Sequence, residues 1–90
     1  MIGDPEDPDL ANMARDELAA ALTLSWRALV KIIPWGDSFE GISPAGRDVG
    51  VERGYIWLTE PGGDILCEIL VQGLGSNTAK AAAVIPAPKA

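Results

Sequence analysis

The sequence contains no histidine and only one cysteine, Cys67. Without histidine, Ser-His-Asp and Cys-His catalytic arrangements are excluded, and proton transfer near neutral pH would depend on carboxylates, the thiol, a tyrosine or lysines. A single cysteine excludes a disulfide or a cysteine-based metal cluster within one chain, which points to a reducing compartment. The carboxylates do not have the spacing of a calcium-binding loop, and no glycine-rich segment has the context of a phosphate-binding loop. We therefore predict no metal and no cofactor.

Basic residues are scarce, and long apolar runs are missing. Seven Lys and Arg are spread singly along the chain against thirteen Asp and Glu, which gives a net charge of -6. Because no basic stripe is available to neutralise phosphates, nucleic acid and anionic membranes are poor candidates for partners. Arg27 and Lys31 interrupt the longest apolar stretch, and the first residues lack the pattern of a signal peptide. We expect a cytoplasmic protein that does not bind membranes.

The length of 90 residues allows one small domain. Four of the first nine residues are acidic, and prolines interrupt them, so we expect residues 1–8 to be a flexible acidic lead. Residues 9–85 would form a single domain, and residues 86–90 a flexible tail. A domain of this size buries only about 60 to 65% of its unfolded surface. A homodimer is therefore our expectation, because a partner would stabilise so small a core.

The first predicted element is a helix. Asp7 has the character of an N-cap and Pro8 that of a first helical residue. One apolar face follows at helical spacing: Leu10, Met13, Ala14, Leu18, Ala21 and Leu22. We expect this helix to extend to about Ala21.

Residues 22–33 satisfy two periods at once. Thr23, Arg27 and Lys31 prolong the polar stripe of the helix, which indicates one long rod. The even-numbered residues from Leu22 to Ile32 are all apolar, which is the alternation of a strand. Periodicity alone leaves both interpretations open.

The rest of the chain predicts an irregular loop and an antiparallel meander. Proline and glycine mark turns at 34–37 and 43–46, so we expect residues 34–47 to be irregular. Strands are predicted at 49–58 and 65–71, joined by the turn Glu60-Pro61-Gly62-Gly63-Asp64, with the odd-numbered residues of the second strand facing the core. A last strand of small residues is predicted at 78–85, with a helix as the alternative. The fold class is therefore α+β, with an N-terminal helix packed on a curved antiparallel sheet of three to four strands.

One stretch resembles a known family. Phe39-x-Gly41-Ile42-x-Pro44-x-Gly46-Arg47-x-Val49, followed by Gly63-Asp64-Ile65-Leu66-x-Glu68, is similar to the motif of SnoaL-like polyketide cyclases of the superfamily named after nuclear transport factor two. With Leu24-Ser25-Trp26-Arg27 in the place of a preceding strand, the resemblance covers residues 24–68. It implies a cone-shaped α+β fold with an apolar pocket, and it favours a strand at residues 24–27.

The chain also departs from that family. It is too short for the full set of N-terminal helices that closes the cone. The histidine that usually precedes the Phe-x-Gly segment has no counterpart, and the aspartate that often follows the segment ending at Glu68 is missing. The resemblance therefore implies a fold and a pocket more than it implies cyclase activity.

Two groups of residues are candidates for a site. The aromatic residues suit either a pocket for a flat apolar ligand or a core or dimer interface; they are Trp26, Trp35, Phe39, Tyr55 and Trp57. Among the carboxylates, two of Asp37, Glu40 and Asp48 could converge as an acid-base pair, or all three are solvated loop residues and turn caps. Glu68 would be a base if it faced a cavity, and otherwise an outward residue paired with Arg53 or Arg47. Cys67, without a basic neighbour, is expected to be an inert core thiol.

Three functions of different class follow. The first is a non-catalytic ligand-binding or dimerisation module, whose partner is a second copy or a small apolar ligand. The second is a SnoaL-like isomerase or cyclase, with Glu68 or Asp37 as the base and Tyr55 stabilising a developing oxyanion. The third is a structural component of a larger assembly, joined through exposed strand edges. The missing histidine and aspartate favour the first.

Overall fold

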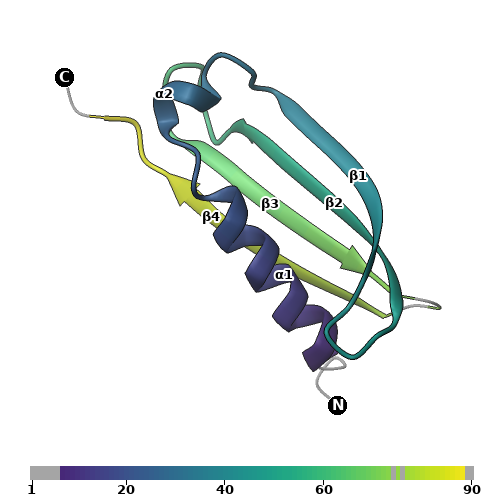
Figure 1. The fold of residues 1–90 in the computed structure, drawn as a ribbon. Helices are drawn as coiled ribbons and strands as arrows, with labels where there is room; N and C mark the ends of the chain where they lie inside the picture. Colours follow the sequence, from purple (N-terminus) through teal and green to yellow (C-terminus); the bar gives the residue numbers. More distant parts are fainter. Residues whose placement is uncertain (1–6, 74, 76, 89–90) are drawn as a thin grey trace.

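The computed structural model describes residues 7–73, 75 and 77–88 of the chain. Its elements are α1 (Pro8–Ala21), α2 (Trp26–Leu29), β1 (Trp35–Ile42), β2 (Asp48–Trp57), β3 (Ile65–Gln72) and β4 (Thr78–Ile85). The strands form one antiparallel sheet in the order β1-β2-β3-β4, and α1 packs over β3 and β4 (Figure 1). This confirms the predicted α+β class, with four strands. No helix in the described ranges is long and apolar enough to cross a membrane.

Local signals set the start and the buried face of α1. The Asp7 side chain accepts hydrogen bonds from the backbone N–H groups of Asp9 (3.0 Å) and Leu10 (3.5 Å), and Pro8 follows the cap. These bonds satisfy donors that the first turn of a helix leaves free. The predicted apolar face is largely buried, and the helix ends at Ala21 as expected. Leu22 is the exception, because it lies beyond the last turn and is 39% exposed.

The β2–β3 hairpin and β4 form where the sequence predicts them. The odd-numbered residues of β3 face α1 and are buried: Ile65, Cys67, Ile69 and Val71. In register with them lie Val51 of β2 and Ala79 of β4, which are also buried. Each large aliphatic side chain stabilises the fold by about 1.5 to 3 kcal/mol when it is removed from water. This face of the sheet is therefore the main part of the core.

The prediction of an irregular loop at residues 34–47 is wrong for most of that range. Residues Trp35–Ile42 are paired with β2 over eight positions, from Trp35 opposite Tyr55 to Ile42 opposite Asp48. The predicted turn at 43–46 does form, with Gly46 at a φ of 87° and its N–H donating to the Ser43 carbonyl at 2.8 Å. Glycine and proline disfavour a strand in isolation, but pairing with a formed neighbour overrides that preference.

Residues 22–33 form neither the predicted rod nor the predicted strand. A single helical turn, α2, is capped by Ser25, whose Oγ accepts from the Ala28 N–H at 3.2 Å. The turn buries Leu29 completely and reverses the chain between α1 and β1. Leu24 and Ile32, apolar residues of the expected strand, are 43% and 44% exposed. The strand implied at 24–27 by the family resemblance is therefore absent.

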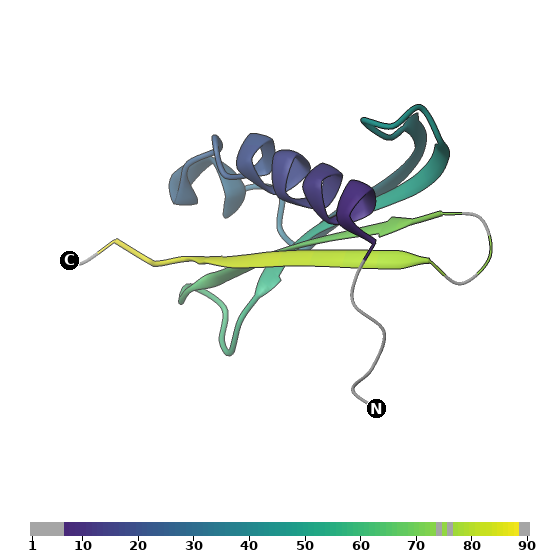
Figure 2. The ribbon, with the colours of Figure 1, turned by 90° about the horizontal axis from the view of Figure 1, so that it is seen from below.

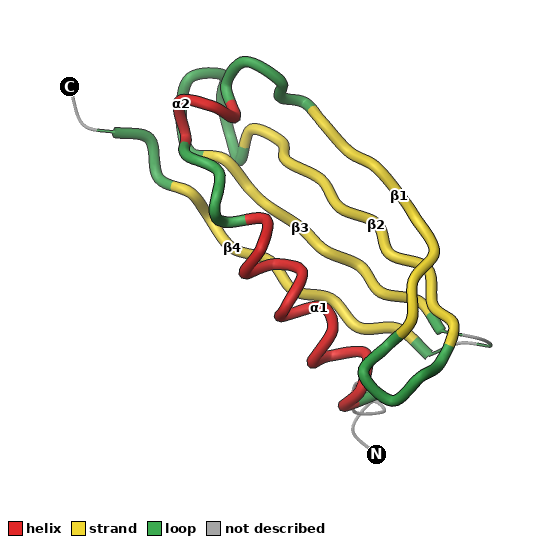
Figure 3. Tube along the Cα trace, in the orientation of Figure 1, coloured by secondary structure: helices red, strands yellow, loops and turns green. Residues whose placement is uncertain are grey.

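The sheet is curved, and contacts at both ends hold it against the helices. Figure 2 shows the β1–β2 hairpin curling beside α1, while β4 runs straight. At one end Arg47 binds Asp7 at 2.7 Å and Asp9 at 3.0 Å, and the Ala45 N–H donates to Asp9 at 2.9 Å. At the other end α2 and its flanking loops lie beside the β2–β3 turn (Figure 3). The contacts of Arg47 and Ala45 with the two aspartates join the N-terminus of α1 to the β1–β2 turn.

Candidate functional site

The predicted aromatic residues gather at the helix-bearing side of the sheet as two pairs and Phe39. Trp26 of α2 lies against Trp57 with the ring centroids 6.4 Å apart, and its Nε1–H donates to the Gly63 carbonyl at 2.9 Å. Trp35 and Tyr55 are directly opposite each other on β1 and β2, with their centroids 5.4 Å apart. The first pair packs α2 onto the end of the sheet. The second continues the core toward β1.

An arginine occupies the space between the aromatic residues of β1. Arg53 lies opposite Asp37 and makes two hydrogen bonds to its carboxylate, one from Nε to Oδ1 at 2.8 Å and one from Nη2 to Oδ2. The guanidinium carbon lies 5.5 Å from the Trp35 ring centroid and 4.9 Å from that of Phe39. A bidentate ion pair stacked on two rings is held in one geometry. The rings of Trp35 and Phe39 are thus contacted by Arg53, a residue of the same chain.

This arrangement also determines the chemistry of Asp37. The hydrogen bonds from Arg53, together with its charge, hold the pKa of the Asp37 carboxyl below its ordinary value. A carboxylate whose charged form is stabilised in this way is a weaker base. Its position therefore gives no support to Asp37 as a general base.

Tyr55 and Cys67 are both buried in the core. The Tyr55 hydroxyl donates a hydrogen bond of 2.7 Å to the carbonyl of Ala21, which joins β2 to the end of α1. Burial raises the pKa of the Tyr55 hydroxyl and that of the Cys67 thiol. Tyr55 thus uses its only donor within the protein, and Cys67 lies among apolar neighbours, as predicted for a core thiol.

Glu68 lies on the opposite side of the sheet. It is exposed, between Gly54 of β2 and Ala82 of β4 in the strand register, as the outward-facing interpretation requires. The two arginines proposed as its partners bind elsewhere: Arg53 binds Asp37, and Arg47 binds the acidic residues at the start of α1. Glu68 borders a small hollow of about 250 Å³ that Leu70 and Lys80 also line.

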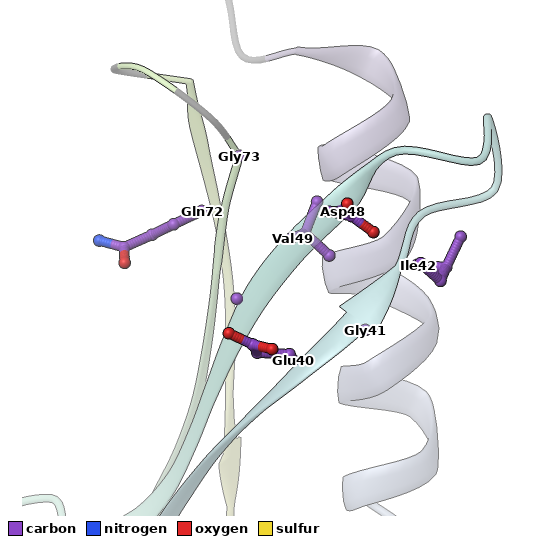
Figure 4. A pocket seen from close by; sticks show the side chains of 8 residues that line it. Glu40, Gly41, Ile42, Asp48, Val49, Gln72 and Gly73 are labelled. Atoms are coloured by element: carbon purple, nitrogen blue, oxygen red, sulfur yellow. The ribbon is translucent and has the colours of Figure 1, made fainter.

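A larger hollow of about 580 Å³ lies between the ends of β1, β2 and β3 (Figure 4). Glu40 and Asp48 line it, so two of the three loop carboxylates do lie near each other. They are diagonal neighbours in the register, a relation that places side chains about 7 to 8 Å apart. Figure 4 shows Gln72 extended away from both carboxylates. Asp37 lies on the other side of the sheet, because side chains alternate along β1.

The side of the sheet opposite α1 carries an apolar row that the sequence reasoning missed. Ile56, Leu66 and Val84 stand side by side across β2, β3 and β4, and Ile56 and Val84 are 43% and 47% exposed. Leu58 continues the row beyond β2 and is 42% exposed. The available signal was in β3, where Leu66 and Leu70 make two of the four even-numbered positions apolar.

Comparison of the chain with protein-family models, curated proteins and solved structures found no match. The resemblance to SnoaL-like polyketide cyclases stays a prediction from the motif. Within the described residues, no group of three or more acidic or cysteine side chains is placed to hold a metal ion.

Proposed function

We propose that this chain is a non-catalytic module that associates with a second copy of itself. The observation that carries the proposal is the incomplete cover of the sheet. Helix α1 packs over β3 and β4, and the side of the sheet facing away from it has the apolar row Ile56, Leu66 and Val84 at its surface. Apolar side chains that stand together on a sheet are a typical feature of association surfaces.

The dimensions of the molecule support this proposal. Its shortest extent is 16 Å, which is about the thickness of one sheet and one helix, since packed layers are about 10 Å apart. The radius of gyration is 14.3 Å, whereas a compact domain of this length has about 12 Å. A slab of this kind exposes much surface for its length, and association would remove apolar parts of it, such as Val84, from water.

The positions of the candidate catalytic residues support the non-catalytic form of the proposal. Asp37 is held by Arg53, Tyr55 donates its hydroxyl hydrogen to Ala21, and Glu68 stands at the surface. A small apolar ligand has less support than a second copy. The hollow of about 580 Å³ is bordered by the carboxylates of Glu40 and Asp48, while the aromatic residues contact one another and Arg53.

Sedimentation velocity over a wide range of protein concentration tests the proposal. We expect a species with twice the monomer mass of 9.4 kDa that dissociates on dilution. The melting temperature should also rise with concentration, because association stabilises the folded state by mass action. A mass of 9.4 kDa at every concentration, with a constant melting temperature, would overturn it.

A further inference from the structure

We propose that the second copy docks against the outer edge of β4 and the adjacent flank of α1, so that two sheets join into one. This inference rests on the proposed self-association and adds the surface. Of the apolar row, Val84 belongs to the joining strand, whereas Ile56 and Leu66 stay on the surface of the joined sheet. In the described part of the chain, β4 is an end strand with β3 as its one neighbour in the sheet. It has eight residues, runs straight in Figure 2, and contains no proline and one charged residue, Lys80.

The other end strand is protected in a way that β4 is not. β1 carries Asp37 and Glu40 and two glycines, Gly36 and Gly41, and it follows the curl of the sheet. Charges, glycine and twist are features that prevent an edge from pairing with another strand. β4 has almost none of them, which distinguishes the two edges.

The sequence of β4 is compatible with antiparallel pairing to itself. If side chains are to stay on their own sides of the sheet, the two-fold axis must lie midway between the two copies of one residue, and the middle of β4 offers Ala81 or Ala82. With the axis at Ala81, Lys80 faces Ala82 of the second copy. With the axis at Ala82, Lys80 faces Val84. Neither register brings like charges together.

The position of α1 suits the same axis. The helix packs over both β3 and β4, so its axis lies about midway between these two strands. The two-fold axis would lie half a strand spacing beyond β4, so the helix axis is about one strand spacing from it. Neighbouring strands are about 4.8 Å apart, which places the two copies of α1 about 9.6 Å apart. Packed helices have their axes about 8 to 10 Å apart. Joining the strands therefore brings the helices into contact without a shift of either.

The flank of α1 that would meet its copy is apolar next to the sheet and carries Arg15 on its outer side. Met13 faces β1, because its Cε lies 3.3 Å from the place a Cβ of Gly41 would take. At about 100° per residue, Ala11, Leu18 and Leu22 lie about 140 to 180° around the helix from Met13, on the flank toward the β4 edge. Arg15 lies about 160° from Met13 on the outer side of the same flank, and it is exposed. Ala11 and Leu18 are partly buried against the core, and Leu22 is 39% exposed. An apolar strip with a charged residue at its margin is the arrangement of an interface with an apolar centre and a polar rim.

Two matched lysine substitutions test the surface. Ala82 of β4 and Ser38 of β1 are both exposed, and both lie on the side of the sheet facing away from α1, one on each end strand. Ala82→Lys places two lysines opposite each other in either register, whereas Ser38→Lys adds the same charge to the other edge. We expect dimerisation of A82K to weaken about tenfold or more, because facing like charges are strongly unfavourable. S38K should dimerise like the unmodified chain.

Ala82→Glu identifies the register by sedimentation. In either register the new glutamate also lies beside Glu68 of its own chain, so this contact does not distinguish the registers. An axis at Ala81 pairs the new glutamate with Lys80 of the second copy and strengthens the dimer. An axis at Ala82 places two glutamates together, and mixing A82E with A82K then restores association. Circular dichroism establishes that each variant is folded. If the unmodified chain is a dimer and A82K dimerises as well as S38K, this surface is wrong while self-association stands. A monomeric unmodified chain overturns both proposals.

Discussion

Replacing Tyr55 with Phe should destabilise the fold even though it removes a single oxygen atom. The hydroxyl of Tyr55 donates to the carbonyl of Ala21 over 2.7 Å, and the two residues are only 4% and 9% exposed. A hydrogen bond contributes about 0.5 to 1.5 kcal/mol net, and a buried group left without a partner costs about 1 to 3 kcal/mol. We expect the free energy of unfolding to fall by about 1 to 2 kcal/mol.

The chain offers a matched control for this substitution. The Thr23 hydroxyl donates to the carbonyl of Ala20, also over 2.7 Å, but this bond is exposed. Water can replace the hydroxyl there, so Thr23→Val should change the free energy of unfolding by less than about 0.5 kcal/mol. The two variants therefore differ mainly in the burial of the bond that they remove.

Urea denaturation followed by circular dichroism measures both variants at one protein concentration, since association would otherwise change the apparent stability. With an unfolding entropy of about 2.1 cal/mol/K per residue, the expected loss for Tyr55→Phe corresponds to a melting temperature lower by about 5 to 10 °C. Equal losses in the two variants would refute the argument that burial makes the Tyr55 bond important.

Two further predictions concern the faces of the sheet and the acidic residues. Ile69→Ala should lower the free energy of unfolding by about 2 to 5 kcal/mol, and Leu70→Ala, on the other side of β3, by less than half as much; a larger loss for Leu70→Ala in thermal denaturation would contradict the assigned core face. Hydrogen bonds lower the pKa values of Asp7, Asp9 and Asp37 in the folded protein, chiefly from Arg47, Ser43 and Arg53 respectively. Their stabilising effect is complete above about pH 4, the unfolded value, and is lost as the pH falls through the lower folded values, so a melting temperature that rose on acidification below pH 4 would oppose this assignment.

Most of the expectations that depended on neighbouring residues were accurate, and the irregular loop at residues 34–47 was the exception. Asp7 and Pro8 mark the start of α1 through bonds within one turn, and the glycines between β2 and β3 permit a tight turn wherever the rest of the chain lies. The alternation of β3 predicts its buried side because side chains point to opposite faces of any strand. Such signals operate over a few residues.

Predictions failed or stayed open for segments whose structure depends on contacts with residues far away in the sequence. Residues 22–33 fit two periods equally well, and the choice of a single turn depends on the burial of Leu29 in a core formed by later strands. β1 contains glycines that oppose a strand locally, and it forms because β2 supplies the pairing. Asp37 and Arg53 are 16 residues apart, so their ion pair could not be found from spacing within one element.

By itself, the sequence determined which chemistry is possible and most of the regular elements. The missing histidine and the lone cysteine exclude whole classes of catalytic site, and caps, turns and alternation locate α1, β2, β3 and β4. Only the tertiary structure decided which side of the sheet each candidate residue occupies, and that Arg53 lies among the aromatic residues. The reason is physical, since periodicity is a property of one element, whereas burial, pairing and the cover of a sheet depend on which elements meet.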